Sequence, residues 1–172
     1  MRVGIRHALL FVAYVTTIPS ANWLIGNVGS VCIPNGPCLI PVAPGIMAPS
    51  GVLMIGLALV LRDALHETSG GKWTLGAIAA GTILSAMVAP PALIIASAVA
   101  FLISELADFG VYAPLRKRGL MLAVITSGIV GAAVDSIVFL LIAFGSLDYA
   151  IGQIIGKLWA SLAAAFYLSV RR

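Results

Sequence analysis

"WTLGAIAAGTILSAMVAPPALIIASAVAFLISELA", residues 73–107, is the stretch that decides the fold class. Its only charged residue is Glu105, and its length approaches that of two helical bilayer crossings of about 20 residues each. Pro90 and Pro91 divide the run, because proline lacks an N–H group and clashes with the preceding helical turn. The stretch therefore predicts two transmembrane helices joined by a short turn.

The composition of the whole chain has the same character. Of 172 residues, 61% are hydrophobic and 9% are charged, and the mean hydropathy is +1.12. A soluble domain has about 25% charged residues, so this chain lacks the charge to cover a water-facing surface. The composition predicts an integral membrane protein. We expect no nucleic-acid partner, because no basic helix with interleaved aromatic residues is present, and the scattered His and Cys residues predict neither a metal site nor a cofactor.

Six segments are long and apolar enough, or nearly so, to cross a membrane. The polar stretches "HETSGGK" (66–72) and "GSLD" (145–148) are typical of turns between them. We therefore expect residues 1–172 to form one all-α transmembrane domain, a bundle of six helices. The expected helices span about 6–26, 49–67, 73–89, 91–113, 119–144 and 149–170.

The cations predict how the bundle is oriented. If the N-terminus is cytoplasmic, nine of the ten Lys and Arg residues fall at cytoplasmic positions and the three outward connections contain none. The positive-inside rule then places both termini in the cytoplasm and the chain in the inner membrane as a multi-pass protein. The nine cations are Arg2, Arg6, Arg62, Lys72, Arg116, Lys117, Arg118, Arg171 and Arg172.

The first segment has an alternative interpretation. "MRVGIRHALLFVAYVTTIPSA" (1–21) has a charged start, an apolar stretch and small residues, as a secretory signal peptide does. Its removal would leave five helices and an outward N-terminus. A first transmembrane helix preserves the even number of crossings and is the interpretation that we favour.

Residues 27–49, "NVGSVCIPNGPCLIPVAPGIMAP", are uncharged and rich in Pro and Gly. We expect an extracytoplasmic loop that caps the mouth of the bundle, although its lack of charge would also suit contact with lipid head groups. Cys32 and Cys38 bracket the turn sequence "IPNGP". They could form a disulfide on an oxidising face or remain buried free thiols, and the sequence leaves both open.

A polar stripe runs along the predicted fourth helix. Glu105 and Asp108 are three residues apart, and Phe101 and Tyr112 extend the same face. An unpaired ionisable residue inside a membrane costs several kcal/mol, so such residues usually face a cavity or one another. Stripes of this kind predict an interior polar site. Other polar residues expected there, by helix, are Arg62, Asp63, His66 and Glu67; Ser127, Asp135 and Ser136; Gln153, Lys157 and Ser161.

A purely structural role is the alternative for these residues. Lys157 could pair with Asp135 or Glu105 only to fix the packing of the helices. The group from Arg62 to Glu67 lies near the predicted cytoplasmic end and could be an interfacial charged turn. Small-residue faces such as Gly128, Gly131 and Ala132 indicate close helix packing and could also support a homodimer.

Four blocks of the sequence resemble the queuosine-precursor transporter family, also called the vitamin-uptake-transporter family. They are "LRDALHETSG" (61–70), "SELADFGVYAPLRKRG" (104–119), "SGIVGAAVDSIVFLLIAFG" (127–145) and "GQIIGKLW" (152–159). The resemblance implies a six-helix carrier of 7-cyano- or 7-aminomethyl-7-deazaguanine, the bases from which queuosine in tRNA is made. It also implies a fold similar to that of the substrate-binding components of energy-coupling-factor transporters.

The chemistry of such a base suits the polar residues. A 7-deazaguanine offers a ring N1–H and an exocyclic amine as donors beside a carbonyl acceptor; a carboxylate accepts the donors and Gln or Lys donates to the carbonyl. Stacking on an aromatic ring is worth about 1–3 kcal/mol per base. The expected binding residues are Phe101, Glu105, Asp108, Tyr112, Asp135, Phe139, Gln153, Lys157 and Trp159, with Arg62, Asp63 and Glu67 as gating or coupling residues.

Three other functions remain open. The chain could be a vitamin-type binding component that works with a separate energising module, a structural or pore-forming membrane protein, or a membrane-embedded enzyme. An enzyme is the least supported, since neither a nucleophile with a base nor a metal-ligand pattern is visible, and we expect no catalytic residue. The expected partners are the lipid bilayer and a small nucleobase-like substrate. Protons, sodium or metabolic trapping could each drive uptake.

Overall fold

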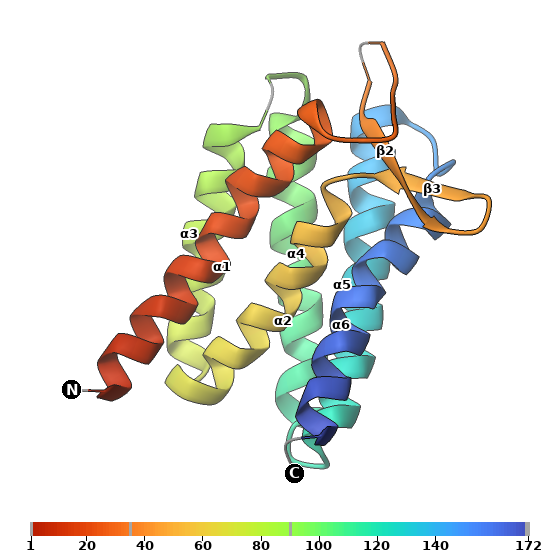
Figure 1. Cartoon of the computed structure of the whole chain (residues 1–172). Coiled ribbons are helices and arrows are strands. Elements are labelled where there is room, and N and C mark those ends of the chain that lie inside the picture. Colours follow the sequence, from red (N-terminus) through yellow and green to blue (C-terminus); the bar gives the residue numbers. More distant parts are fainter. Residues whose placement is uncertain (1, 35, 90, 171–172) are drawn as a thin grey trace.

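The computed structural model describes residues 2–34, 36–89 and 91–170 (Figure 1). Within these ranges the chain forms six α-helices, as the sequence predicts. Pro90, Arg171 and Arg172 lie outside the described residues, as do the side chains of Arg2 and Arg6. The helices are α1 (Arg2–Asn27), α2 (Val52–Ser69), α3 (Gly71–Val88), α4 (Ile94–Leu115), α5 (Leu120–Phe144) and α6 (Ala150–Val170), with a short 3₁₀ helix, η1 (Pro91–Leu93), before α4.

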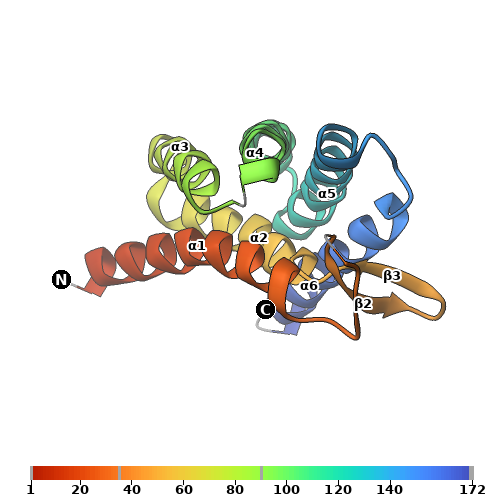
Figure 2. The same ribbon diagram turned by 90° about the horizontal axis from the view of Figure 1, so that it is seen from above.

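The helices pack in two layers, which Figure 2 shows from above. One layer contains α3, α4 and α5, and the other contains α1, α2 and α6. Neighbouring helices contact each other within each layer, and contacts of α1 with α3, α2 with α5 and α5 with α6 join the layers. The interior of the bundle therefore lies between the two layers, where side chains from all six helices can meet.

Glycines with positive φ form two of the connections between helices. Gly70 has φ 80° between α2 and α3, and Gly145 has φ 64° at the end of α5. The N–H of Gly70 donates to the carbonyl of His66 at 2.9 Å, and that of Gly145 donates to Leu141 at 3.1 Å. A residue with a β-carbon is strained at such φ values, so these two positions allow tight helix ends.

Many large apolar side chains lie at the surface and several charged side chains lie in the interior, which is unusual for a soluble protein. Large apolar side chains are exposed on all six helices, and charged residues such as Arg62, Glu105 and Lys157 are buried. Within the described ranges, four helices have the length and hydropathy to cross a membrane: His7–Asn27, Gly71–Val88, Ile94–Leu115 and Leu120–Phe144. This is the pattern of a multi-pass membrane protein.

Residues 27–49 differ from the expected loop, because they include a small antiparallel sheet. Its strands are β1 (Val31–Cys32), β2 (Cys38–Ala43) and β3 (Ile46–Pro49), in the order β1-β2-β3. Pro41 would break a fully paired central strand, because it has no N–H to donate. Here β1 pairs only with Cys38 and Leu39, so Pro41 has a partner, Met47, on the β3 side alone. The abundance of proline in this segment favoured the prediction of a loop over that of a strand.

The sheet packs at the end of the bundle opposite the two termini (Figure 1). The indole Nε1 of Trp159 on α6 donates to the carbonyl of Val42 on β2 at 2.9 Å. After β3, the hydroxyl of Ser50 donates to the carbonyl of Leu24 on α1 at 2.7 Å. Of the two states that the sequence leaves open for Cys32 and Cys38, the structure has the disulfide.

Candidate functional site

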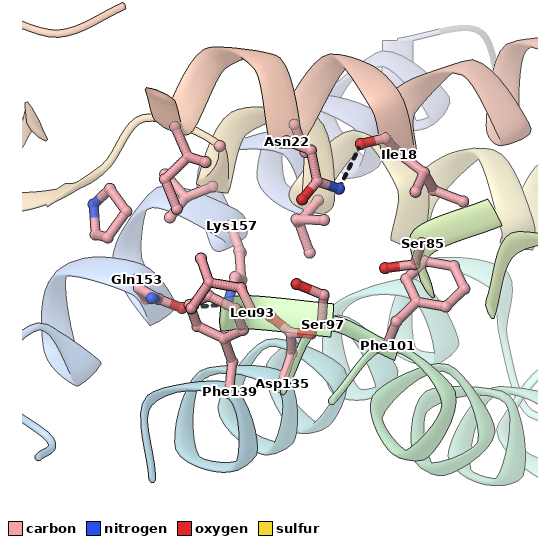
Figure 3. Close-up of a pocket in the computed structure, with 16 residues that line it drawn as sticks. Ile18, Asn22, Ser85, Leu93, Ser97, Phe101, Asp135, Phe139, Gln153 and Lys157 are labelled. Carbon is pink, nitrogen blue, oxygen red and sulfur yellow. Dashed lines mark hydrogen bonds and ion pairs between the residues drawn. The ribbon is translucent and has the colours of Figure 1, made fainter. Parts of the chain in front are cut away.

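A cavity of about 70 Å³ lies inside the half of the bundle nearest the sheet. All six helices contribute to the lining, and Figure 3 shows side chains from α1 facing those of α4, α5 and α6 across the space. Five of the nine predicted binding residues line it: Phe101, Asp135, Phe139, Gln153 and Lys157.

The ammonium of Lys157 forms hydrogen bonds with three neighbouring side chains. Its ammonium donates to Asp135 Oδ2 at 2.6 Å, to Ser136 Oγ at 2.7 Å and to Gln153 Oε1 at 2.8 Å. An ammonium has three N–H donors, so these contacts use all of them. Lys157 therefore positions Asp135 and Gln153. The expectation that a lysine donates to a ligand carbonyl does not suit this geometry.

The same contacts determine what Gln153 and Asp135 can offer a ligand. Because an ammonium is only a donor, the oxygen of the Gln153 amide must face Lys157, and the NH₂ group is left as a donor. The Oδ2 of Asp135 accepts from Lys157, whereas the one hydrogen bond that Oδ1 accepts from the described residues is long, 3.4 Å, and comes from Ser104. Asp135 thus keeps acceptor capacity at the cavity wall, next to an amide donor.

Two phenylalanines supply the aromatic part of the lining. Phe139 lies on the Lys157 side of the view in Figure 3, and Phe101 lies near Ser85. Phe101 can occupy this place because α3 has a glycine opposite it, where the β-carbon of any other residue would lie 2.8 Å from the Phe101 ring. Gly81 is therefore a packing position that shapes the cavity.

Sequence reasoning missed three polar residues that line the cavity: Asn22, Ser85 and Ser97. Ser97 lies one turn before Phe101 on α4, so extending the predicted stripe by four residues would have found it. Asn22 donates its amide to the carbonyl of Ile18 at 3.1 Å, which leaves its side-chain oxygen as an acceptor. No charged residue near Asn22 or Ser85 in the sequence marked them as site residues.

Glu105 and Asp108 face a different partner, the guanidinium of Arg62. Arg62 Nε lies 3.8 Å from Glu105 Oε2, Nη2 lies 2.9 Å from Asp63 Oδ1, and Nη2 also forms an ion pair with Asp108. All four residues are at most 5% exposed. We call these four residues the Arg62 cluster. Arg62 was counted among the cytoplasmic cations and also among the interior polar residues. It lies in the bundle interior, so its place among the cytoplasmic cations was wrong.

Glu67 and Tyr112 belong to a third group, at the end of the bundle where the termini lie. Arg116 pairs with Glu67 through two contacts of 2.5 Å, and the hydroxyl of Tyr112 donates to Glu67 at 3.0 Å. The hydrogen bonds from Arg116 lower the pKa of Glu67 below its usual value, and Glu67 in turn raises the pKa of Arg116. This group lies away from the cavity lining.

Trp159 lies at the surface, where it is 55% exposed and bonded to the sheet. It therefore anchors the sheet to α6, and the expected stacking role in the cavity does not fit its position. Gly128, Gly131 and Ala132 are buried between helices of this chain, so they are not free to form a homodimer contact.

The predicted stripe on α4 joins the three polar groups. Phe101 lines the cavity, Glu105 and Asp108 lie in the Arg62 cluster, and Tyr112 contacts Glu67. Ser104 bonds to Asp135 and directly precedes Glu105. Buried polar groups thus follow one another from the cavity toward the end of the bundle where the termini lie.

Comparison with known proteins identifies the family. A family model described as "Putative vitamin uptake transporter" matches residues 85–170, which is half of the 172-residue chain. The match includes α4, α5 and α6, and with them Asp135, Gln153 and Lys157. No curated protein and no solved structure matches the chain. Over its second half the chain carries the features that define this family, and it belongs to the family of vitamin uptake transporters.

Proposed function

We propose that the protein imports a queuosine precursor, 7-cyano- or 7-aminomethyl-7-deazaguanine, and binds it in the cavity. One observation carries this proposal: a buried carboxylate, Asp135, keeps an acceptor oxygen at the wall of a cavity that also contains Phe101 and Phe139. The ring N1–H and the amine of the base are donors that suit this acceptor. The NH₂ group of Gln153 suits the base carbonyl, and the phenylalanines suit its flat faces.

The charge of the cavity bears on the choice between the two bases. Asp135 and Lys157 form a compact neutral pair, so the wall has no uncompensated charge to balance a cationic ligand. The aminomethyl base carries an ammonium group near neutral pH, whereas the cyano base is uncharged. Burying an unpaired charge is costly. We therefore expect the cyano base to bind more tightly.

The positions of the charges support a topology with both termini in the cytoplasm and six crossings of the inner membrane. Arg62 and Lys157 are buried. The other eight of the ten Lys and Arg residues lie at the start of α1, at the start of α3, between α4 and α5, or after α6 in the sequence. The connections at the sheet end contain neither residue. The disulfide lies at that end, as expected for an oxidising face. The cavity then lies in the outward half of the bundle, where it would load from outside.

A vitamin-type binding component is the second candidate, because the family description names vitamin uptake. In that case the ligand would be a vitamin, and a separate energising module would copurify with the chain from its native membrane. Competition between ligands separates the two candidates. Binding that a vitamin such as riboflavin displaces, and a 7-deazaguanine does not, would favour the second.

Equilibrium binding to the purified protein tests the proposal. We expect saturable binding of 7-cyano-7-deazaguanine, weaker binding of guanine, and at least a tenfold loss of affinity in a variant that keeps the fold but lacks the Asp135 carboxylate. This follows because charge-assisted hydrogen bonds are worth about 1.5–3 kcal/mol each. The double variant Asp135→Asn with Lys157→Met is the suitable protein, since it leaves no unpaired charge. Asp148→Asn, in the exposed connection before α6, is the matched control. Unchanged affinity in the double variant would exclude the cavity as the binding site.

A further inference from the structure

The Arg62 cluster has more negative than positive charge. One guanidinium faces three carboxylates, those of Asp63, Glu105 and Asp108. If all four groups were ionised, the cluster would carry two uncompensated negative charges at positions that are at most 5% exposed. A buried carboxyl group takes up a proton in preference to holding such a charge. The charge count therefore calls for bound protons.

Two hydroxyl groups beside the carboxylates give an independent indication of a ligand. The hydroxyl of Tyr14 on α1 lies against Glu105, and that of Ser127 on α5 lies against Asp108. Both residues are 0% exposed, and neither hydroxyl completes a hydrogen bond to the residues that the structure describes. A buried hydroxyl beside a carboxyl group can donate to the ionised form or accept from the protonated form. A carboxyl group at such a position can therefore gain or lose a proton as the hydrogen bond changes direction.

The surroundings favour a proton over a metal cation as this ligand. Among the described residues, no group of three or more His, Cys, Asp or Glu is arranged to hold a metal ion. The guanidinium of Arg62 also stands among the three carboxylates and would repel a sodium ion brought there. A proton needs only one carboxylate oxygen and no coordination shell.

The Arg62 cluster is also connected to the cavity through α4, so a bound ligand can affect it. Ser104 bonds to Asp135 at the cavity wall and is followed directly by Glu105. Arg62 Nη1 lies 3.5 Å from the carbonyl oxygen of Glu105, and its guanidinium carbon lies 5.8 Å from the centre of the Tyr112 ring on the far side. A ligand that shifts Asp135 or Phe101 therefore acts on the helix that carries two of the cluster's carboxylates.

We propose that the Arg62 cluster is a proton-binding site that couples import of the base to the proton gradient; the coupling rests on the proposed function. A proton from water outside forms an O–H bond with a carboxylate oxygen of Glu105 or Asp108, and that bond breaks again when the proton passes to water on the cytoplasmic side. The guanidinium keeps its protons throughout. The titratable or charged groups around this site are Tyr14 on α1, Arg62, Asp63, His66 and Glu67 on α2, Glu105, Asp108 and Tyr112 on α4, Arg116 after α4, Asp135 on α5 and Lys157 on α6.

Infrared spectroscopy of the full chain in lipid tests the proton site without any substrate. We expect a carbonyl stretch of protonated carboxylic acid near neutral pH, and we expect Glu105→Gln or Asp108→Asn to remove part of it. Asp148→Asn, which changes an exposed carboxylate, should leave it intact. A wild-type protein without this band would overturn the proposal, and so would a band of undiminished intensity in both cluster variants.

Uptake into proteoliposomes tests the coupling. With 7-cyano-7-deazaguanine as the probe, an outside pH lower by about one unit should support up to about tenfold accumulation per coupled proton. In Glu105→Gln or Asp108→Asn, uptake should no longer respond to the gradient, and the pH profile of base affinity should flatten. A wild type that binds the base but ignores the gradient would overturn the coupling alone. A wild type that binds no base would overturn the proposed function and the coupling with it.

Discussion

Lys157 and Arg62 are both buried cations of one helical bundle, but their surroundings differ. Lys157 has one carboxylate, Asp135, and two neutral oxygens that together use its three donors. Arg62 has three carboxylates and incomplete hydrogen-bond geometry, since its Nε and Nη2 atoms form ion pairs without finished hydrogen bonds to described residues. The first arrangement is balanced and should be rigid, whereas the second can change its protonation. A cavity that recognises a ligand needs side chains held in fixed positions, as around Lys157. A coupling site needs carboxyl groups that can gain and lose a proton, as around Arg62.

The largest effect on stability is expected at the buried pair of Asp135 and Lys157. Asp135→Asn leaves the ammonium of Lys157 buried without a counter-charge, and breaking a buried pair in this way costs about 3–5 kcal/mol. We expect a loss of folded protein of that size in reversible unfolding in detergent. Adding Lys157→Met removes the orphaned charge and should restore most of the stability without restoring base binding. If the single variant is as stable as the wild type, the pair is not the rigid element that its contacts indicate.

The sequence predicts the helices and half of the site for a clear physical reason. Apolar length and proline position determine where helices can cross or end, so α4 and its stripe from Phe101 to Tyr112 could be placed in advance. Spacing along one helix does not show which neighbour each side chain meets. Glu105 and Asp108 therefore were expected in the cavity, although they face Arg62 on α2. The strand β2 was missed because its proline, Pro41, is compatible with pairing only when the partner strand is short.

A smaller effect is expected where α5 packs against the Arg62 cluster. A β-carbon at Gly131 would lie 2.7 Å from Asp108 Oδ2 and 2.9 Å from its Cβ, so Gly131→Ala should push Asp108 away from Arg62. Overpacking of this kind costs about 1–3 kcal/mol, which unfolding in detergent would detect. The control is Gly76→Ala on α3, where a β-carbon meets nothing within 4 Å. Equal stability of the two variants would mean that α5 does not hold Asp108 in place.

Glu105→Gln should change the free energy of unfolding much less than Asp135→Asn does. The Arg62 cluster has more carboxylates than its cation needs, so replacing a protonated carboxyl group by an amide of the same shape leaves no orphaned charge. Such a change can be nearly neutral, and we expect the free energy of unfolding to change by no more than about 1 kcal/mol. The measurement is the same unfolding titration, run beside Asp135→Asn. A loss as large as that of Asp135→Asn would show that Glu105 is an essential ionised partner of Arg62.

The smallest effect belongs to the pair between Glu67 and Arg116, whose side chains are partly exposed, in contrast to both buried sites. Exposed pairs contribute about 0.2–1 kcal/mol, and we expect Glu67→Gln to cost about 0.5 kcal/mol, less at high salt. Because the pKa of Glu67 is lowered in the folded protein, the contribution is complete above the unfolded pKa of about 4.3 and disappears as the pH falls through the lowered folded value. Unfolding measured from neutral pH downward should show the wild type and Glu67→Gln converging in acid. A difference that is instead constant across this range would mean that Glu67 stabilises the end of α2 through packing and its bond to Tyr112, and that its charge contributes nothing measurable.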